Sequence, residues 1–341
     1  MKSFDKNLID LNEKNILITG GTGSFGKAFT HFVLERYQPK KIIIFSRDEM
    51  KQYEMAQEFS EKKFPCIRYF IGDVRDADRL EMAMRGVDYV IHAAALKHVP
   101  AAEYNPFECI RTNVYGAENV VKASIRANVI RVIALSTDKA ANPVNLYGAS
   151  KLASDKIFIA ANNLSGLGGT RFSVVRYGNV IGSRGSVVPL FQKLIKSREK
   201  SIPITDKRMT RFWITLEQGV HFVLSTMEMM YGTEIFVPKI PSMKIVDIAS
   251  TMTDIPHEIV GIRPGEKLHE VLISDDDARN TLELDDRYIV EPDFLPELND
   301  YYSKIGAVPV DNEFRYSSDS NSEWLHKDSL NAMLGNLEIK Q

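Results

Sequence analysis

The sequence has little cysteine and no long apolar run. Only two cysteines, Cys66 and Cys109, occur in 341 residues, and their spacing fits neither a disulfide framework nor a thiolate metal site. No apolar segment approaches the roughly 20 residues that a membrane-spanning helix needs. We therefore expect a protein with no disulfides, no bound metal and no membrane partner.

The start of the chain and its balanced charge exclude two further classes. Residues 1–13 are polar and carry no basic stretch followed by an apolar one, so they do not resemble a secretion signal and we expect a cytoplasmic protein. The formal net charge of -2 gives no general attraction to nucleic acid. Any anionic ligand must therefore be held by a local group of donors.

Short β-branched runs alternate with amphipathic stretches through the first half of the chain. With 44% hydrophobic residues, the chain can bury a large core. The expected strands are Asn15–Thr19, Lys41–Phe45, Ile67–Ile71, Tyr89–His92, Arg131–Ser136 and Phe172–Tyr177. The expected helices are Phe25–Arg36, Met50–Phe59, Arg75–Met84, Gly116–Ala127 and Ser150–Ala161. This order predicts a Rossmann-type doubly wound α/β fold, with a parallel sheet covered on both faces.

The alternation ends near Tyr177, after which shorter pieces are separated by loops rich in Gly, Ser and Pro. We expect residues 1–178 to form mainly the Rossmann domain. Residues 179–341 should form mainly a smaller C-terminal substrate-binding lobe, with some segments returning to the first domain. Residues 297–341 are expected to be a surface-wrapping tail. Open α/β sheets bind ligands outside the carboxyl ends of their strands, so the ligand should lie between the two lobes.

A glycine-rich turn follows the first expected strand and opens a helix. Its glycines permit a tight turn, close approach of a pyrophosphate and packing of the helix on the strand, while the helix N-terminus adds N–H donors. We therefore predict dinucleotide binding. The expected contacts in this loop are Thr19, Gly20, Gly23, Ser24, Phe25 and Gly26.

The end of the second expected strand favours NADP over NAD. An NAD enzyme usually places a carboxylate here for the ribose 2′-OH, whereas this chain has Ser46 and Arg47, with Lys51 one turn later. The two cations can neutralise a 2′-phosphate; a solvated, charged helix start is the alternative. Further contacts are expected from Asp73 and Val74 with adenine and from Ala93, Ala94 and Ala95 near the nicotinamide ribose.

Tyr147 and Lys151 are spaced to lie on the same face of a helix. An ammonium group beside a phenol favours the phenolate, which lowers the pKa of the tyrosine and lets it accept an alcohol proton as hydride leaves. The pattern is common by chance. It gains weight here because it follows the fifth strand, whose end reads Thr137, Asp138, Lys139.

Together these segments resemble the extended short-chain dehydrogenase/reductases that modify nucleotide sugars. The closer resemblance is to the soluble inverting UDP-N-acetylglucosamine 4,6-dehydratases of pseudaminic acid synthesis. It runs from about Asn15 to Glu270 and is carried by Phe45–Glu49, Ala93–Pro100, Leu135–Pro143 and Arg176–Val180. Retaining dehydratases have Asp-Glu after the threonine, where this chain has Asp138-Lys139. Capsule enzymes that share Thr-Asp-Lys lack the tyrosine present here as Tyr147.

The resemblance implies a catalytic cycle. Tyr147, with Lys151 and Thr137, oxidises C4 of the sugar; Lys139 then removes the C5 proton while Asp138 protonates the departing C6 hydroxyl. Hydride returns to C6, and inversion at C5 gives UDP-2-acetamido-2,6-dideoxy-β-L-arabino-hex-4-ulose. To act as a base, Lys139 should have its pKa depressed by burial near Lys151 and arginines. An ordinary salt bridge to a carboxylate is the alternative.

The resemblance also implies a UDP-sugar site in the second lobe, where Arg263 meets the diphosphate, Glu266 a ribose hydroxyl and Arg211 a second phosphate oxygen. Other expected substrate contacts are Lys97, Asn179, Arg184, Val188, Pro189 and Thr205, and Asn179 and Val180 are also expected near the cofactor. We expect UDP-N-acetylglucosamine as the substrate and a homo-oligomer as the assembly.

Three alternatives are left open. A UDP-sugar 4-epimerase would share Tyr147 and Lys151 but needs no Lys139, and a C5-retaining 4,6-dehydratase has the same scaffold. A non-catalytic regulator that senses NADP would have the same fold, although such proteins usually lose the tyrosine or the lysine that this chain keeps.

Overall fold

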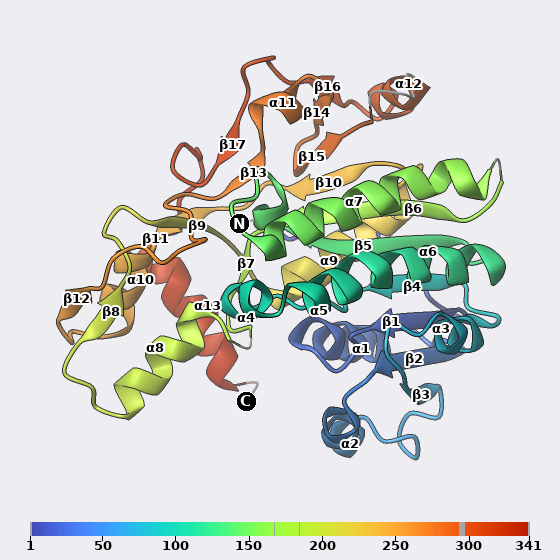
Figure 1. The fold of residues 1–341 in the computed structure, drawn as a ribbon, viewed down its shortest axis with the longest axis horizontal. Coiled ribbons are helices and arrows are strands. Elements are labelled where there is room, and N and C mark those ends of the chain that lie inside the picture. The colour runs from blue at the N-terminus through green and yellow to red at the C-terminus, as the bar shows by residue number, and fades with distance from the viewer. Residues whose placement is uncertain (1, 167, 184, 293–296, 340–341) are drawn as a thin grey trace.

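A ten-stranded sheet forms the centre of the molecule (Figure 1). The computed structural model describes residues 2–166, 168–183, 185–292 and 297–339. The parallel part of the sheet runs, in spatial order, through β3 (Ile67–Ile71), β2 (Lys41–Ser46), β1 (Asn15–Thr19), β4 (Tyr89–His92), β5 (Arg131–Thr137), β6 (Arg171–Tyr177) and β10 (Ile235–Pro238). Three antiparallel strands then continue it: β15 (Arg287–Val290), β14 (Thr281–Glu283) and β16 (Val308–Pro309).

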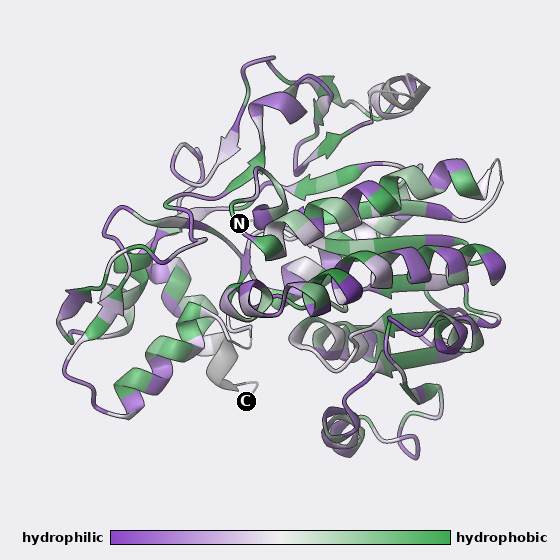
Figure 2. Cartoon of the chain, viewed as in Figure 1, coloured by the Kyte–Doolittle hydropathy of each residue, from purple (hydrophilic) through white to green (hydrophobic). Residues whose placement is uncertain are grey.

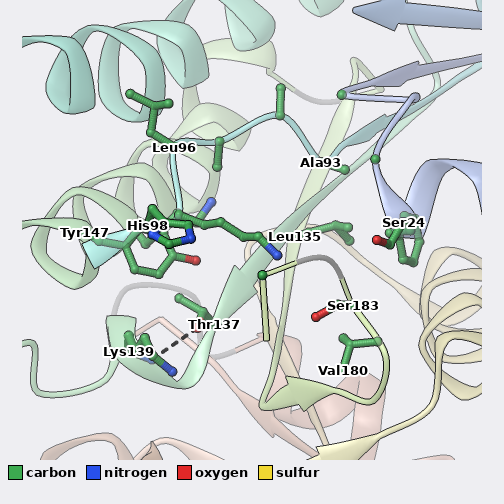
Figure 3. Close-up of a pocket in the computed structure, with 18 of the residues that line it drawn as sticks. Ser24, Ala93, Leu96, His98, Leu135, Thr137, Lys139, Tyr147, Val180 and Ser183 are labelled. Carbon is green, nitrogen blue, oxygen red and sulfur yellow. Dashed lines mark hydrogen bonds between the residues drawn. The ribbon is translucent and has the colours of Figure 1, made fainter. Parts of the chain in front are cut away.

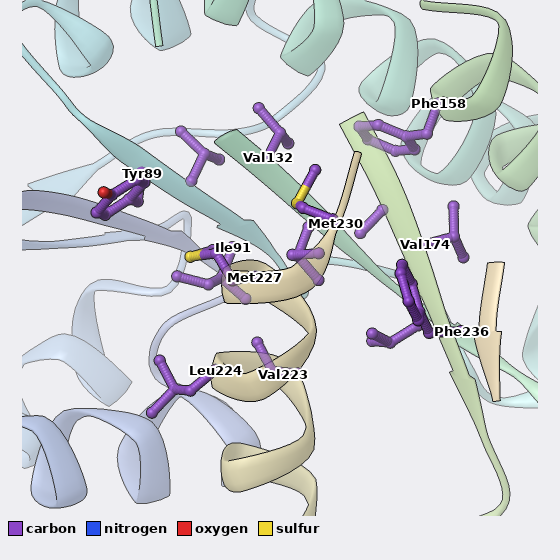
Figure 4. Packing of buried hydrophobic residues seen from close by; sticks show 14 of the residues in the cluster. Tyr89, Ile91, Val132, Phe158, Val174, Val223, Leu224, Met227, Met230 and Phe236 are labelled. Carbon is purple, nitrogen blue, oxygen red and sulfur yellow. The ribbon is translucent and has the colours of Figure 1, made fainter. Parts of the chain in front are cut away.

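The predicted fold class is confirmed. Every strand expected from the sequence is present, and no strand end differs from its expected position by more than one residue. The physical reason is that strands such as β1, β2 and β4 are buried almost throughout, as parallel strands covered on both faces must be. Figure 4 shows Ile91, Val132, Val174 and Phe236 of the sheet, with Val223 and Met227 of a helix that covers it.

Helices cover both faces of this sheet. On one face, α3 (Ala77–Met84), α6 (Gly116–Arg126) and α7 (Leu146–Ser165) pack side by side, and on the other α1 (Ser24–Arg36) packs against α9 (Leu216–Met229) (Figure 1). The connection from β2 to β3 contains α2 (Glu49–Glu58), and β4 leads into α4 (Val99–Tyr104), α5 (Pro106–Ile110) and the π-helical turn η1 (Arg111–Tyr115). None of the described helices is long and apolar enough to cross a bilayer.

Helix α7 begins four residues before the expected Ser150, because Asn145 caps it. The side chain of Asn145 accepts a hydrogen bond from the N–H of Gly148 at 2.8 Å, which satisfies one of the otherwise unpaired donors of the first turn. Tyr147 therefore lies in the first turn of the helix, at the carboxyl edge of the sheet.

A second region carries its own small core. It contains the three-stranded sheet β11 (Ser242–Lys244), β9 (Thr210–Ile214) and β7 (Asn179–Val180), and the pair β8 (Ile202–Ile204) and β12 (His257–Ile259). Three helices complete it: α8 (Val187–Lys196), α10 (Ile245–Met252) and α13 (Lys327–Ile339). Its buried cluster includes Val188, Phe191, Trp213, Ile248 and Leu330. Figure 2 shows mixed polar and apolar residues along these helices, in contrast with the continuous apolar strands of the large sheet.

The C-terminal segment is more than the surface-wrapping tail expected from its polar composition. It includes α12 (Glu297–Ser303), β17 (Tyr316–Ser317), which pairs with β13 (Val271–Ile273), and α13; the short helix α11 (Asp275–Ala278) follows β13. Tyr302 is fully buried, and its hydroxyl donates to the carboxylate of Glu234 at 2.6 Å. Scattered aromatic residues thus anchor a polar segment to the large core, while Leu330 joins the smaller one.

Candidate active site

A cleft of about 830 Å³ runs between the carboxyl edge of the large sheet and the second region. Residues from the ends of β2, β5 and β6 and from the loops that follow β1, β2, β3, β4 and β6 line one side, and residues 263–267 line the other. Figure 3 shows Thr137, Lys139 and Tyr147 gathered at one end, with Ser24 and Ala93 at the other. This is the position in which open α/β sheets bind their ligands.

The glycine loop presents bare backbone to the cleft. Gly20 has a φ of +65°, and a Cβ there would lie 2.9 Å from the Cα of Ala94. A Cβ on Gly26 would lie 2.2 Å from the carbonyl oxygen of Gly21. Gly23, the N-cap of α1, makes no side-chain cap. The helix N-terminus and the close packing fit the pyrophosphate of a dinucleotide.

Thr19 supports this loop from beneath. Its side chain is fully buried, its Oγ1 lies 2.8 Å from Nδ1 of His92, and the same atom accepts a hydrogen bond from the N–H of Ala94 at 3.3 Å. Thr19 is absent from the lining of the cleft. The residue predicted to contact the cofactor therefore connects β1 to β4 instead.

The cations expected to hold a 2′-phosphate lie at the end of the cleft near β2. Arg47 Nη1 lies 3.5 Å from Oδ2 of Asp73, and Lys51 Nζ lies 2.9 Å from Oδ2 of Asp48. About half of each cationic side chain is exposed, 52% for Arg47 and 49% for Lys51, so both can meet an incoming anion. Burial raises the pKa of Asp73, but the hydrogen bonds and charge of Arg75 outweigh it and hold that pKa below its usual value.

Tyr147 behaves differently from the sequence expectation. Burial raises its pKa to about 12, and this effect is opposed by the positive charge of Lys139 and by a hydrogen bond with Thr137. Lys151 is itself buried, which lowers its pKa, while the nearby Asp155 raises it. Lys139 is therefore a cation that favours the phenolate, in addition to the Lys151 expected from the sequence.

Lys139 is held between two buried carboxylates. Its Nζ lies 3.0 Å from Oδ1 of Asp138 and 3.2 Å from Oε1 of Glu270. Burial alone would lower the pKa of Lys139, but the charges of Asp138 and Glu270 raise it above its usual value. The expected depression of this pKa is therefore wrong for the chain without ligands, because the neighbouring carboxylates have the larger effect.

Sequence reasoning missed Glu270 and Lys267, which line the same end of the cleft. Arg211 Nε lies 3.7 Å from Oε1 of Glu270, and Lys267 Nζ lies 4.0 Å from Oε2. Arg211 also donates to the carbonyl oxygens of Thr210, Lys267 and Leu268, so this expected phosphate ligand is engaged within the protein. The only sequence signal for Glu270 was its charge directly before an apolar strand.

The loop containing Arg263 and Glu266 reaches the first lobe. Asn145 Nδ2 donates to the carbonyl oxygen of Gly265 at 2.8 Å, and Lys267 Nζ donates to that of Ala141 at 2.7 Å. The residue that caps α7 thus also holds the loop expected to bind the diphosphate.

Most predicted site residues line the cleft. These are Gly20, Gly23, Ser24, Phe25, Gly26, Ser46, Arg47, Lys51, Asp73, Val74, Ala93, Ala94, Ala95, Lys97, Thr137, Lys139, Tyr147, Lys151, Asn179, Val180, Arg211, Arg263 and Glu266.

Five predicted residues do not line it: Thr19, Asp138, Val188, Pro189 and Thr205. The predicted Arg184 lies outside the described residues. Asp138 lies directly beneath Lys139 and Thr137, with 1% of its side chain exposed. Val188 is turned into the second core by α8.

Comparisons with known proteins place the chain in a family. It matches the family described as polysaccharide biosynthesis protein over residues 16–292. It is 59% identical, over 96% of its length and 99% of the relative's, to a protein of Campylobacter jejuni subsp. jejuni named UDP-N-acetylglucosamine 4,6-dehydratase (inverting). A Rickettsia canadensis protein named UDP-glucose 4-epimerase is 44% identical, over 82% of this chain and 84% of that protein.

The X-ray structure of Pen from Bacillus thuringiensis matches the fold with a TM-score of 0.87 and 37% identity, covering 97% of this chain and 100% of that one. The resemblance stated from the sequence is confirmed: the chain belongs to the polysaccharide biosynthesis protein family, within the extended short-chain dehydrogenase/reductases and in the group that includes the inverting UDP-N-acetylglucosamine 4,6-dehydratases.

Proposed function

We propose that this chain is an NADP-dependent UDP-N-acetylglucosamine 4,6-dehydratase that inverts C5. The observation that carries the proposal is the position of Lys139, paired with Asp138 at 3.0 Å, beside Tyr147 at one end of a cleft whose other end fits a dinucleotide. The relative named UDP-N-acetylglucosamine 4,6-dehydratase (inverting) aligns over nearly the whole chain and supports the same substrate.

The dinucleotide would be held by the glycine loop and by Ala93, Ala94, Asn179 and Val180, with Arg47 and Lys51 available to a 2′-phosphate. When bound, its nicotinamide would supply a reversible acceptor of hydride from the sugar. The protein's own task is to hold the sugar and to move protons at C4, C5 and C6.

The C4 hydroxyl proton would pass to the phenolate of Tyr147. Burial disfavours the phenolate, so the nearby charge of Lys139 and the hydrogen bond with Thr137 are needed to make it accessible. Lys151, buried one helical turn away, adds a second cation on the same face of α7. The resulting ketone acidifies the proton on C5.

Elimination then needs a neutral amine and a protonated carboxyl group. The raised pKa of Lys139 favours the opposite arrangement, with the proton on its Nζ, 3.0 Å from Oδ1 of Asp138. Transfer of one proton along this contact produces both required groups at once. The C5–H bond then breaks towards Nζ, its electron pair forms the C5–C6 double bond, and the C6 oxygen leaves as water with the Asp138 proton. The pair returns to its starting charges.

The second lobe would hold the UDP moiety. Arg263 and Glu266 face the cleft from a loop fixed to the N-terminus of α7 through Asn145. Arg263 would meet the diphosphate and Glu266 a ribose hydroxyl, as the resemblance implies. A place in pseudaminic acid synthesis, a cytoplasmic location and a homo-oligomeric state remain predictions from the same resemblance.

A UDP-sugar 4-epimerase is the second candidate, because relatives with 44% identity carry the name UDP-glucose 4-epimerase. Epimerisation needs Tyr147 but no base at C5. The burial of Asp138 against Lys139 favours the dehydratase, because a buried acid and amine in direct contact match an elimination rather than a simple oxidation and reduction.

Nuclear magnetic resonance of the product formed from UDP-N-acetylglucosamine in deuterated water tests the proposal. We expect loss of one water, a C6 methyl group, deuterium at C5 and the L-arabino configuration. A product isomeric with the substrate would support the epimerase instead. A C5-retained ketone would keep the dehydratase and remove the inversion.

A further inference from the structure

Glu270 is the buried acidic residue of the cleft that the reaction as proposed does not use. Its side chain is 2% exposed, and it lies directly before β13, which packs against the turn η2 (Asp138–Ala140). The backbone N–H of Glu270 donates to Oγ of Ser318 at 2.9 Å, and its carbonyl oxygen accepts from the N–H of Ser318 at 2.8 Å. The backbone is therefore fixed from both sides, and the carboxylate has a defined position.

The contacts of this carboxylate centre on Lys139. Oε1 lies 3.2 Å from Nζ of Lys139 and 3.7 Å from Nε of Arg211. Oε2 is buried, accepts no hydrogen bond from the described residues and lies 4.0 Å from Nζ of Lys267. Because burying a carboxylate oxygen without a donor costs free energy, such a group is expected to persist only where it serves a purpose.

We propose that Glu270 is a positioning residue that holds Lys139 Nζ in place as an ammonium group and thereby sets the pH range in which Lys139 can remove the C5 proton. The inference rests on the proposed function, because it assigns Lys139 the role of base. Two carboxylates around one amine stabilise its protonated form, whereas the elimination needs the neutral form. Asp138 exchanges a proton with Lys139 during the reaction, so its own charge changes. Glu270 does not take part in this exchange, and its charge therefore stabilises the protonated form of Lys139 throughout.

Other charged and titratable groups around Lys139 also affect whether it is protonated. Arg211 on β9, Lys97 after β4 and Lys267 in the loop before β13 are cations near Lys139, and each disfavours its protonated form. Tyr147 on α7 also faces it. Asp138 and Glu270 outweigh the cations, since the pKa of Lys139 lies above its usual value. Removing the charge of Glu270 should therefore shift the balance towards the neutral amine.

The test isolates removal of the C5 proton from the other steps. The C5-retained 4-ketone, which is the C5 epimer of the expected product and carries its C5 proton on the same face as the substrate, is added to the NADP-loaded enzyme in deuterated water, and loss of this proton is followed against pH by nuclear magnetic resonance. This exchange requires neither hydride transfer nor loss of water. Glu270→Gln keeps an oxygen acceptor for Lys139 and removes the charge, so the rise in exchange rate should move to lower pH by roughly one unit.

Two variants sharpen the result. Glu270→Asp keeps the charge but withdraws it from Lys139, so its profile should lie between those of wild type and Glu270→Gln. Glu283→Gln removes the carboxylate of β14 that is paired with Lys239 at 2.7 Å, and it should leave the profile unchanged. If Glu270→Gln does not fold, the exchange rate of Glu270→Asp alone must still rise at a lower pH than that of the wild-type enzyme.

The inference would be overturned if the pH profile of C5 exchange in the Glu270 variants coincided with that of the wild-type enzyme or moved to higher pH. Failure of the proposed function is a separate outcome: the wild-type enzyme would then release no water from UDP-N-acetylglucosamine.

Discussion

The two ends of the cleft are built in different ways. The end near α1 is made of backbone and small residues that lie close together in the sequence, such as Gly20, Gly23 and Gly26. The end near α7 is made of buried charges from distant segments, with Lys139 and Arg211 both next to Glu270. The first end fits a ligand by shape and N–H donors, whereas the second controls protonation.

This difference determines how each end should fail. Backbone sites are damaged by added volume, because the loop cannot move away without disturbing its strand and helix. Charge clusters are damaged by neutral substitutions of nearly equal volume, because the remaining charges change their protonation. Substitutions can therefore separate binding of the dinucleotide from chemistry on the sugar.

The largest effect is expected from Lys139→Met, which removes the base with little change in side-chain volume. Dehydration of UDP-N-acetylglucosamine should fall by about 10²- to 10⁴-fold, and C5 exchange with deuterated water should fall in parallel. Binding of NADPH, measured by fluorescence titration, should stay near the wild-type value because Lys139 lies at the sugar end. Undiminished C5 exchange would contradict the role of Lys139 as base.

A similarly sharp but smaller effect is expected at the opposite end from Gly26→Ala. The added Cβ would lie 2.2 Å from the carbonyl oxygen of Gly21, and relieving this clash should cost about 1–3 kcal/mol. We expect weaker NADPH binding by about tenfold or more and a lower melting temperature. The matched control is Gly219→Ala in α9, where a Cβ would meet nothing within 4 Å; equal loss in both variants would show a general effect of the substitution.

Arg47→Ala should affect only the choice of cofactor. The guanidinium is 52% exposed and its ion pair with Asp73 is loose at 3.5 Å, so the fold should not depend on it. Affinity for NADP should fall by about tenfold, corresponding to about 1.4 kcal/mol, while affinity for NAD stays the same. Parallel titrations with the two dinucleotides measure this difference; equal losses for both would remove Arg47 from 2′-phosphate recognition.

The contrast also explains how much the sequence could predict. The strands, the glycine loop and the Tyr147 helix depend on local patterns, so they were placed to within a few residues. The expected start of α7 at Ser150 is four residues too late, because Asn145 caps the helix and lets it begin at Leu146. Patterns of this kind can be recognised from the sequence alone, because the turn, the strand and the helix are neighbours in the chain.

Glu270 could not be found in this way. It meets Lys139 only because β13 pairs with β17 and packs against η2, a consequence of the whole fold. The same limit explains the pKa of Lys139: its basic neighbours were expected from the sequence, but the two carboxylates that dominate were not both visible. The C-terminal segment likewise gave no sign that Tyr302 would be buried.

The smallest predicted effect concerns a second role of Lys139, which is to favour the phenolate of Tyr147. Burial raises the pKa of Tyr147 to about 12, and the charge of Lys139 acts against this rise. Because oxidation at C4 needs the phenolate, its rate should increase with pH. Lys139→Met removes a cation, raises the pKa of Tyr147 further and should shift this increase to higher pH by roughly half a unit to one unit. Single-turnover NADPH absorbance measures the shift, with Lys239→Met at the sheet edge as the control. A profile unmoved by Lys139→Met would mean that the phenolate depends on Lys151 alone, as the spacing of Tyr147 and Lys151 first suggested.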